Sequence, residues 1–405
     1  MAHPTHNPLP IRTSRAGSTE ITVLFTCFIA ATYGFGIYLF AALMPDIRAA
    51  LGFDYAAVGV ITASVQAGFL VFALLSGFLA PVLGARRTIL GSTLLCAACL
   101  LAMPMVSSTL ALGLLLTLLG AAAASVWIPM AALTQEIVPE ARRGMALGLM
   151  SSGTAYGVFL NGWVVPAVLP GYGWARVCLL LGGVTLLLAL WALWRMGWRD
   201  GPVAPAAQHA SRPKASRLRV LLRPLSLGVL AMMFLNGLSC MPAQNYLSGL
   251  MREQLHYDVS AAALAWTLIG VLGMGGGMAM GALADRITIR WAMVLTYVLL
   301  SMAALCFRWH AGLAMVYAGA VCFGLAFYAV FGLVPAYVGA LYSADDTSAV
   351  FGVGNVLLGL GGVAGNLVGG ISRQNTGDFD GVFGLVLAAA LATLALSFFM
   401  RNERA

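Results

Sequence analysis

The residues Gly281–Arg286 have the sequence Gly-Ala-Leu-Ala-Asp-Arg and end one long apolar segment, and Arg290 begins the next. A related sequence occurs 204 residues earlier, where Gly77–Val82 is Gly-Phe-Leu-Ala-Pro-Val, followed by Gly84 and two arginines. The Asp-Arg of the later stretch corresponds to Pro-Val in the earlier one. The pair suggests an internal repeat, and the fold prediction depends on whether that repeat extends along the chain.

Composition places the chain in a membrane. Of its 405 residues, 61% are hydrophobic and 9% are charged, whereas soluble domains carry about 25% charged residues. The formal charge of +8 comes from basic residues that lie between apolar segments. This placement favours topology signals and contacts with anionic lipid over a nucleic-acid partner.

The apolar segments predict an all-α membrane protein, because lipid offers no hydrogen-bond partner to a backbone that is not helical. A spanning helix needs about 20 apolar residues, and twelve segments qualify. They are 20–44, 55–80, 88–106, 110–136, 142–168, 174–195, 224–250, 259–284, 289–307, 312–342, 346–371 and 379–400. We expect two six-helix bundles.

The distribution of basic residues predicts the domains and the topology. A polar tail (1–19) precedes the first bundle (20–195), a proline-containing basic linker (196–223) precedes the second (224–400), and a short tail (401–405) follows. With both termini in the cytoplasm, 17 of the 22 Lys and Arg residues fall on the cytoplasmic side and 5 on the outer side. This bias predicts cytoplasmic termini, and the compact chain with its short loops predicts an inner membrane of bacterial type.

The repeat extends over most of each half. The stretch Ile47–Asp54 aligns without gaps with Met251–Asp258, so that one Arg and one Asp recur in equivalent places. Matches within helices at the same shift are Gly120 with Gly324, Gly148 with Gly352, Gly157 with Gly361 and Trp127 with Phe331. Parallel repeats of six helices are typical of secondary transporters built from two bundles.

Over nearly its whole length the chain resembles the major facilitator superfamily. Members share twelve helices, a basic central loop and a loop of the form G-x-x-x-D-R-x-G-R-R/K after helix 2, which is echoed after helix 8. The echo is the better copy here, with Gly281, Asp285, Arg286 and Arg290, whereas Pro81 replaces the acidic residue of the first copy.

Helices 4 and 5 match the family in part. Gly144, Gly153, Gly157 and Gly162 resemble the glycine pattern of the family's antiporters. The arginine that many proton-linked drug exporters carry four residues before Gly120 is Leu116 in this chain.

Four charged residues are candidate gating residues. The resemblance implies that Asp285, beside Arg286, caps or pairs with a helix end while the cytoplasmic side is shut, because a carboxylate is stabilised at a helix N-terminus. Arg142 and Arg143 follow helix 4 and are further candidates. The alternative is an ordinary solvated loop for the first pair and plain topology signals for the second.

No Asp, Glu, Lys or Arg lies in the middle of a predicted helix, so the sequence marks neither a proton-carrying carboxylate nor a deep counter-ion. The candidate substrate-binding residues are therefore neutral, and all lie in helices that line the central cavity in the family. They are Tyr33, Tyr38, Gln66, Trp127, Tyr156, Asn161, Asn236, Gln244, Asn245, Trp266, Tyr328, Phe331 and Asn355. Packing and contacts between helices are the alternative for each.

The sequence favours a secondary active transporter that moves a small organic solute, with an aromatic or monocarboxylic acid as one candidate, by rocker-switch alternating access. Efflux antiport of hydrophobic compounds or drugs is the alternative, and a transporter-like solute sensor is a weaker one. We expect no enzyme, no cofactor, no metal and no nucleic-acid partner, because no cluster of His, Cys and carboxylates occurs. The expected partners are the solute, the lipid bilayer and a coupling proton or counter-substrate. We expect the protein to be a monomer.

Overall fold

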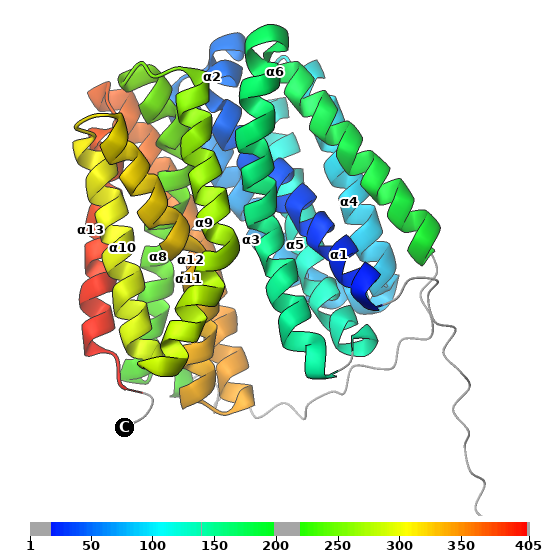
Figure 1. The fold of residues 1–405 in the computed structure, drawn as a ribbon, viewed down its shortest axis with the longest axis vertical. Helices are drawn as coiled ribbons and strands as arrows, with labels where there is room; N and C mark the ends of the chain where they lie inside the picture. Colours follow the sequence, from blue (N-terminus) through cyan, green and yellow to red (C-terminus); the bar gives the residue numbers. More distant parts are fainter. Residues whose placement is uncertain (1–17, 139, 198–218, 403–405) are drawn as a thin grey trace, which may run out of the picture.

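The computed structural model of the protein describes residues 18–138, 140–197 and 219–402. Within these ranges the side chains at 18, 77–81, 128, 131–132, 135–137, 140–144, 196 and 344–345 lie outside the description. Every regular element of the described residues is helical (Figure 1). The predicted linker 196–223 and both predicted tails fall mostly outside these ranges.

The N-terminal half contains eight helical elements among the described residues, one of which, η2, is a short turn. They are α1 (Ser18–Ile29), η1 (Ala30–Tyr38), α2 (Leu39–Leu51), α3 (Tyr55–Leu83), α4 (Ala85–Ala102), η2 (Met103–Met105), α5 (Thr109–Ile137) and α6 (Glu140–Met196). The elements α1, η1 and α2 follow one another without a break, so the first predicted helix continues to Leu51 and ends at Gly52, whose φ of 69° caps it.

The C-terminal half repeats this plan. Its elements are α8 (Pro224–Gly249), η3 (Leu250–Gln254), α9 (Val259–Arg286), α10 (Ile289–Trp309), α11 (Leu313–Leu341), α12 (Ala344–Thr376) and α13 (Asp380–Phe399). The helix predicted over 346–371 reaches Thr376, because the left-handed residue that ends it is Gly377.

Eleven helical segments of the described residues are long and apolar enough to cross a membrane. One of them, Met145–Arg195, has 51 residues, or about 76 Å at 1.5 Å per residue, against a hydrocarbon layer of about 30 Å. Gly173 interrupts it with φ 76° and ψ 168°. Figure 1 shows α6 rising to the top of the view and returning downward.

The sequence repeat has a counterpart in helix packing. A methyl group at Gly157 would lie 2.4 Å from the carbonyl oxygen of Ala30, and one at Gly361 would lie 2.0 Å from that of Phe234. Both residues of the first contact lie 204 positions before those of the second. Gly120 with Val65 and Gly324 with Ile269 form another such pair of contacts.

Helix starts repeat as well. The Asp54 carboxylate accepts a hydrogen bond from the backbone N–H of Ala57 at 2.8 Å, which caps α3. Asp258 caps α9 in the same way, through the N–H of Ala261 at 2.9 Å. The aspartates that match in the sequence alignment therefore share one structural task, which is to satisfy free N–H groups at a helix start.

We predict that Gly157→Ala destabilises the protein. The added methyl group would meet the backbone of Ala30 and Gly34, which cannot rotate away, so we expect a loss of about 1–3 kcal/mol. Gly148→Ala is the matched control, because nothing lies within 4 Å of its added methyl group. Thermal unfolding of both variants in detergent measures the difference, and equal melting temperatures would contradict this packing.

Candidate functional site

The two halves touch closely near one end of the helices, which we call the closed end and define by Asp46, Arg48, Arg252 and Glu253. Across the α3–α12 contact, a methyl group at Gly59 would lie 2.9 Å from the carbonyl oxygen of Asn366. Across the α6–α9 contact, one at Gly162 would lie 3.0 Å from that of Ala263. In the repeat, Gly59 corresponds to Ala263 and Gly162 to Asn366, so the two contacts are equivalent and each half presents the same positions to the other.

At the opposite end, which carries Asp285 and Arg286 and which we call the open end, the same helix pairs separate. The α6 face that packs against α9 continues through Ser151 to Gly148, two turns further on, and both are exposed. In α12 the equivalent Gly352 is exposed and has no atom within 4 Å of an added methyl group. Figure 1 shows the two groups of helices adjoining at the top and diverging toward the bottom.

Two ion pairs join the halves at the closed end. The Arg48 guanidinium donates to the carboxylate of Glu253 through Nε at 3.2 Å and Nη2 at 3.1 Å. Arg252 donates to Asp46 through both terminal nitrogens. The two arginines occupy equivalent positions in the repeat. All four side chains are partly buried, so breaking one pair leaves a partly buried charge without its partner.

An aromatic cluster lies beside these ion pairs. The rings of Tyr55, Tyr246 and Phe379 lie within 6.4 Å of one another, measured between centroids. Arg48 and Arg373 each place the guanidinium carbon 4.8 Å from the centre of the Tyr55 ring. The cluster draws on α2, α3, α8, α12 and the residue that precedes α13, so it adds apolar and cation–π contacts to the same junction between the halves.

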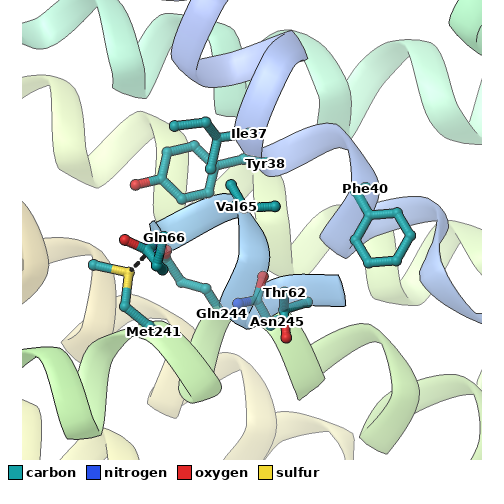
Figure 2. A pocket seen from close by; sticks show the side chains of 9 residues that line it. All are labelled: Ile37, Tyr38, Phe40, Thr62, Val65, Gln66, Met241, Gln244 and Asn245. Atoms are coloured by element: carbon teal, nitrogen blue, oxygen red, sulfur yellow. Dashed lines mark hydrogen bonds between the residues drawn. The ribbon is translucent and has the colours of Figure 1, made fainter. Parts of the chain in front are cut away.

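A pocket lies between the halves, inward from the closed end. It is lined by η1, α2, α3 and α8 through Ile37, Tyr38, Phe40, Thr62, Val65, Gln66, Met241, Gln244 and Asn245 (Figure 2). Its volume is about 10 Å³, which suffices for about one water molecule. A solute therefore needs α3 and α8 to move apart in order to bind between them.

The α8 wall of this pocket is a polar stripe. Met241, Gln244, Asn245, Ser248 and Arg252 follow one another at intervals of three or four residues, or one, and so share one side of α8 and η3. The first three line the pocket of Figure 2, and the last two line a second pocket nearer the closed end. One helix face thus leads from the closed-end ion pairs to the centre of the molecule.

Gln66 and Gln244 are the two glutamines of the first pocket, one from each half. Gln66 donates from Nε2 to the sulfur of Met241 at 3.1 Å, which is a weak acceptor. Gln244 is only 2% exposed, and neither its Oε1 nor its Nε2 has a hydrogen-bond partner among the described residues. Asn245 donates to the side-chain oxygen of Asn366 in α12 at 3.0 Å.

The second pocket contains two more of the predicted residues. Asn161 donates from Nδ2 to the carbonyl oxygen of Gly34 at 2.7 Å, and its Oδ1 has no partner in the described part of the chain. Gly34 belongs to η1, a π-helix in which the usual backbone ladder is altered, so Asn161 fastens α6 to that segment. Trp266 donates from its indole nitrogen to Ser248 at 2.9 Å.

Three predicted residues, in η1, α8 and α11, line neither pocket. The Tyr33 ring meets Phe69 edge-on, with centroids 6.0 Å apart. Tyr328 packs over Gly273, and its hydroxyl is buried and lacks a partner among the described residues. Asn236 lies deeper in the C-terminal half, where it donates to the Tyr297 hydroxyl at 2.9 Å, a contact that holds α8 against α10.

The remaining predicted binding residues lie toward the open end. Trp127 is half-buried against a core cluster of the N-terminal half, whereas its repeat equivalent Phe331 is 44% exposed. Tyr156 is half-buried, and Asn355 is exposed and donates to the carbonyl oxygen of Phe351 in its own helix. The structure therefore does not gather all thirteen predicted residues into one site.

The candidate gating residues lie at the open end as far as they are described. Asp285 and Arg286 are exposed in the last turn of α9. Arg290, the second residue of α10, donates to the carbonyl oxygen of Phe398 in α13. The side chains of Arg142 and Arg143 lie outside the described residues. No group of three or more His, Cys, Asp or Glu that could hold a metal occurs in the ranges that the structure describes.

Sequence analysis missed the closed-end ion pairs, although it aligned Arg48 with Arg252. In a two-bundle repeat, equivalent residues near the symmetry axis approach each other, so a matched arginine at a helix end was a usable signal. It also missed Met241 and Ser248, which resemble ordinary apolar or small residues of a membrane helix and become part of the site only through the position of α3 and α9.

Comparison with known proteins agrees with this architecture. The family model for the Major Facilitator Superfamily matches residues 26–366 and 232–405. No curated protein matches the sequence. A mutant of the nucleoside transporter NupG superposes with a TM-score of 0.77 at 14% identity, covering 94% of this chain and 98% of that one.

A second similar structure is a bacterial homologue of the human lysosomal transporter Spinster, in an inward-facing and occupied conformation. It gives a TM-score of 0.73 at 13% identity, and the match covers 94% of this chain and 96% of that one. At such identities the likeness concerns the fold, and the family model supplies the assignment. The chain belongs to the major facilitator superfamily.

Proposed function

We propose that the protein moves a small organic solute across a membrane by rocker-switch alternating access. The observation that carries this proposal is the unequal packing of the two halves. The helix pairs α3–α12 and α6–α9 touch at the closed end and separate at the open end, and a pocket lined from both halves lies between. A rocking motion of one half against the other would expose that pocket to the two sides in turn.

The topology of the proposal has twelve spans, with α6 crossing twice and turning at Gly173. The closed end then faces outward and the open end faces the cytoplasm, because Arg48, Arg176, Arg252, Arg308 and Arg373 are the few basic residues at the closed end. The bundles are those predicted, 20–195 and 224–400, in an inner membrane. In this orientation the structure is inward-open.

The pocket favours an uncharged solute over an acid. None of the nine residues that line it carries a full charge at neutral pH, and a carboxylate in such a site would lack a counter-ion. The monocarboxylic acid considered from the sequence is therefore the less favoured candidate, whereas a neutral aromatic solute is compatible with Tyr38 and Phe40.

Efflux of hydrophobic compounds is the second candidate. It is favoured by the exposed apolar side chains of Leu149, Phe331 and Val353 toward the open end. The glycine pattern that resembles antiporters is a weaker argument, since Gly153, Gly157 and Gly162 all pack against neighbouring helices. Counterflow of labelled solute in liposomes separates both transport functions from a solute sensor, which would bind without exchange.

Alternating access requires the halves to separate at one end while they approach each other at the other end. We expect spin labels at Ala50→Cys and Ser260→Cys, across the closed end, to show a minor population at longer distance. Labels at Met145→Cys and Ala282→Cys, across the open end, should show a matching population at shorter distance. Double electron–electron resonance on a variant freed of the native cysteines measures both. A single distance at each end in all conditions would exclude the rocking motion.

Breaking a closed-end ion pair should favour the outward-open state. Arg252→Gln leaves Asp46 without its guanidinium, and a hydrogen bond to a charged group contributes about 1.5–3 kcal/mol. We therefore expect the long-distance population of the closed-end labels to rise about tenfold. Arg195→Gln is the control, because Arg195 pairs with Glu20 inside the N-terminal half. An equal rise in both variants would refute a gating role for Arg252.

Loss of charge at the open end should have the opposite effect. If Asp285 stabilises the state in which the open end is shut, Asp285→Asn lowers the long-distance population of the closed-end labels severalfold. Solute exchange in liposomes should fall more than solute affinity does. Unchanged distances and exchange rates would remove Asp285 from the mechanism while leaving the ion pairs at the other end untouched.

A further inference from the structure

We propose that the pocket between α3 and α8 selects uncharged, planar solutes that present an amide edge, meaning an N–H donor beside a carbonyl acceptor. Carboxamides, lactams and nucleobases belong to this class. The inference rests on the proposed function, because it names the solute class of that same site. It is carried by Gln244, Gln66 and the absence of full charge around them.

Gln244 is the principal observation. Its side chain is 2% exposed, and both polar atoms of its amide lack a hydrogen-bond partner among the described residues. Buried polar groups are nearly always hydrogen-bonded, and leaving one unpaired costs about 1–3 kcal/mol. An amide presents one donor and one acceptor side by side, so the group that satisfies both at once is another amide edge.

Gln66 provides a second amide from the other half. Its only hydrogen bond within the described ranges goes to the sulfur of Met241, which a stronger acceptor on a solute would readily replace. Figure 2 shows Gln66, Met241 and Gln244 on one side of the pocket and Thr62 with Asn245 on another. A solute between α3 and α8 can therefore bond to both halves.

The lack of full charges around the pocket disfavours ionic solutes. Tyr38 is the one ionisable residue among the nine that line it. The nearest full charges along α8 belong to the closed-end pair of Arg252 with Asp46, and those two residues neutralise each other. An anionic or cationic solute would lose its hydration without gaining a counter-ion, whereas a neutral amide exchanges its water hydrogen bonds for those of the two glutamines.

Aromatic rings give the pocket flat walls. Tyr38 lines it directly and meets Phe327 of α11 edge-on, with ring centroids 6.5 Å apart and planes at 90°. Phe40 lines it from α2, two residues further along the chain. A ring fixed in this way offers its face to a planar solute, and such stacking contributes about 0.5–1.5 kcal/mol beyond burial.

Bridging of the halves links recognition to movement. Because Gln66 belongs to α3 and Gln244 to α8, a solute that has entered between these helices and is bonded to both holds them against further separation. Binding should therefore lower the populations that are open at either end, which a solute held by one half alone would not do.

The test uses the full chain, purified in detergent, and solutes of matched shape. Nicotinamide and uracil present an amide edge, nicotinate replaces it with a carboxylate, and N,N-dimethylnicotinamide and 1,3-dimethyluracil lack the donor. We expect nicotinamide or uracil to raise the melting temperature with increasing concentration, and the matched analogues to need at least about tenfold more for the same shift, because sites built to hydrogen-bond reject analogues without the group. Equal shifts for nicotinate or the methylated analogues would overturn the proposal, as would no shift with either amide.

Gln244→Met separates recognition from folding. The substitution keeps the side chain's length and removes an unpaired buried amide, so the melting temperature without solute should stay equal or rise, while the shift caused by the amides disappears. Gln66→Met should raise the amide concentration needed for the same shift by about tenfold, because one hydrogen bond to the solute is lost. Retention of the full amide response in both variants would overturn the assignment to this pocket.

Thr393→Val is the control, since Thr393 is buried in α13 and bonds only within its own helix; it should leave the amide response unchanged. The spin-label distances keep this proposal separate from the function on which it rests. Opposite movements at the two ends without any amide response would sustain alternating access and refute the solute class. An amide response without such movements would refute the transporter.

Discussion

Close approach of helix backbones is the interaction on which this structure depends. Lipid provides no driving force for apolar side chains to associate, so contact between helices relies on small residues that allow dense packing. Gly157 and Gly361 achieve this within each half, where an added methyl group would fall 2.4 Å or less from a neighbouring carbonyl oxygen. Gly59 and Gly162 do so between the halves, on the side of the closed end.

Charge and polarity are separated along the helices in a way that fits this packing. The ion pairs of Arg48 and Arg252 join the halves where water and helix ends are near, and their partial exposure limits the cost of desolvation. Toward the centre the polar groups are amides. In the proposed mechanism the ion pairs set which end is shut, and Gln66 and Gln244 lie where a solute would bridge the halves.

Much of the candidate site could be predicted from residue type, and less from position. Tyr38, Gln66, Gln244 and Asn245 were selected because polar groups in a membrane helix are rare, and they line one pocket. Asn236 met the same criterion, yet it bonds to Tyr297, because a helix face that points into its own bundle cannot be distinguished in sequence from one that points to the cavity. Phe331 and Asn355 lie toward the open end, where the separation of the halves exposes them.

The sequence by itself determined the helices, the family and the 204-residue repeat, because long apolar runs must be helical in lipid and equivalent glycines and aspartates keep their roles in both halves. Which end is closed follows from the way the halves meet in the folded molecule. The tertiary structure paired Arg48 with Glu253 and Arg252 with Asp46 and left the amide of Gln244 without a partner in the described chain. Such contacts join residues about 200 positions apart, and no local pattern specifies them.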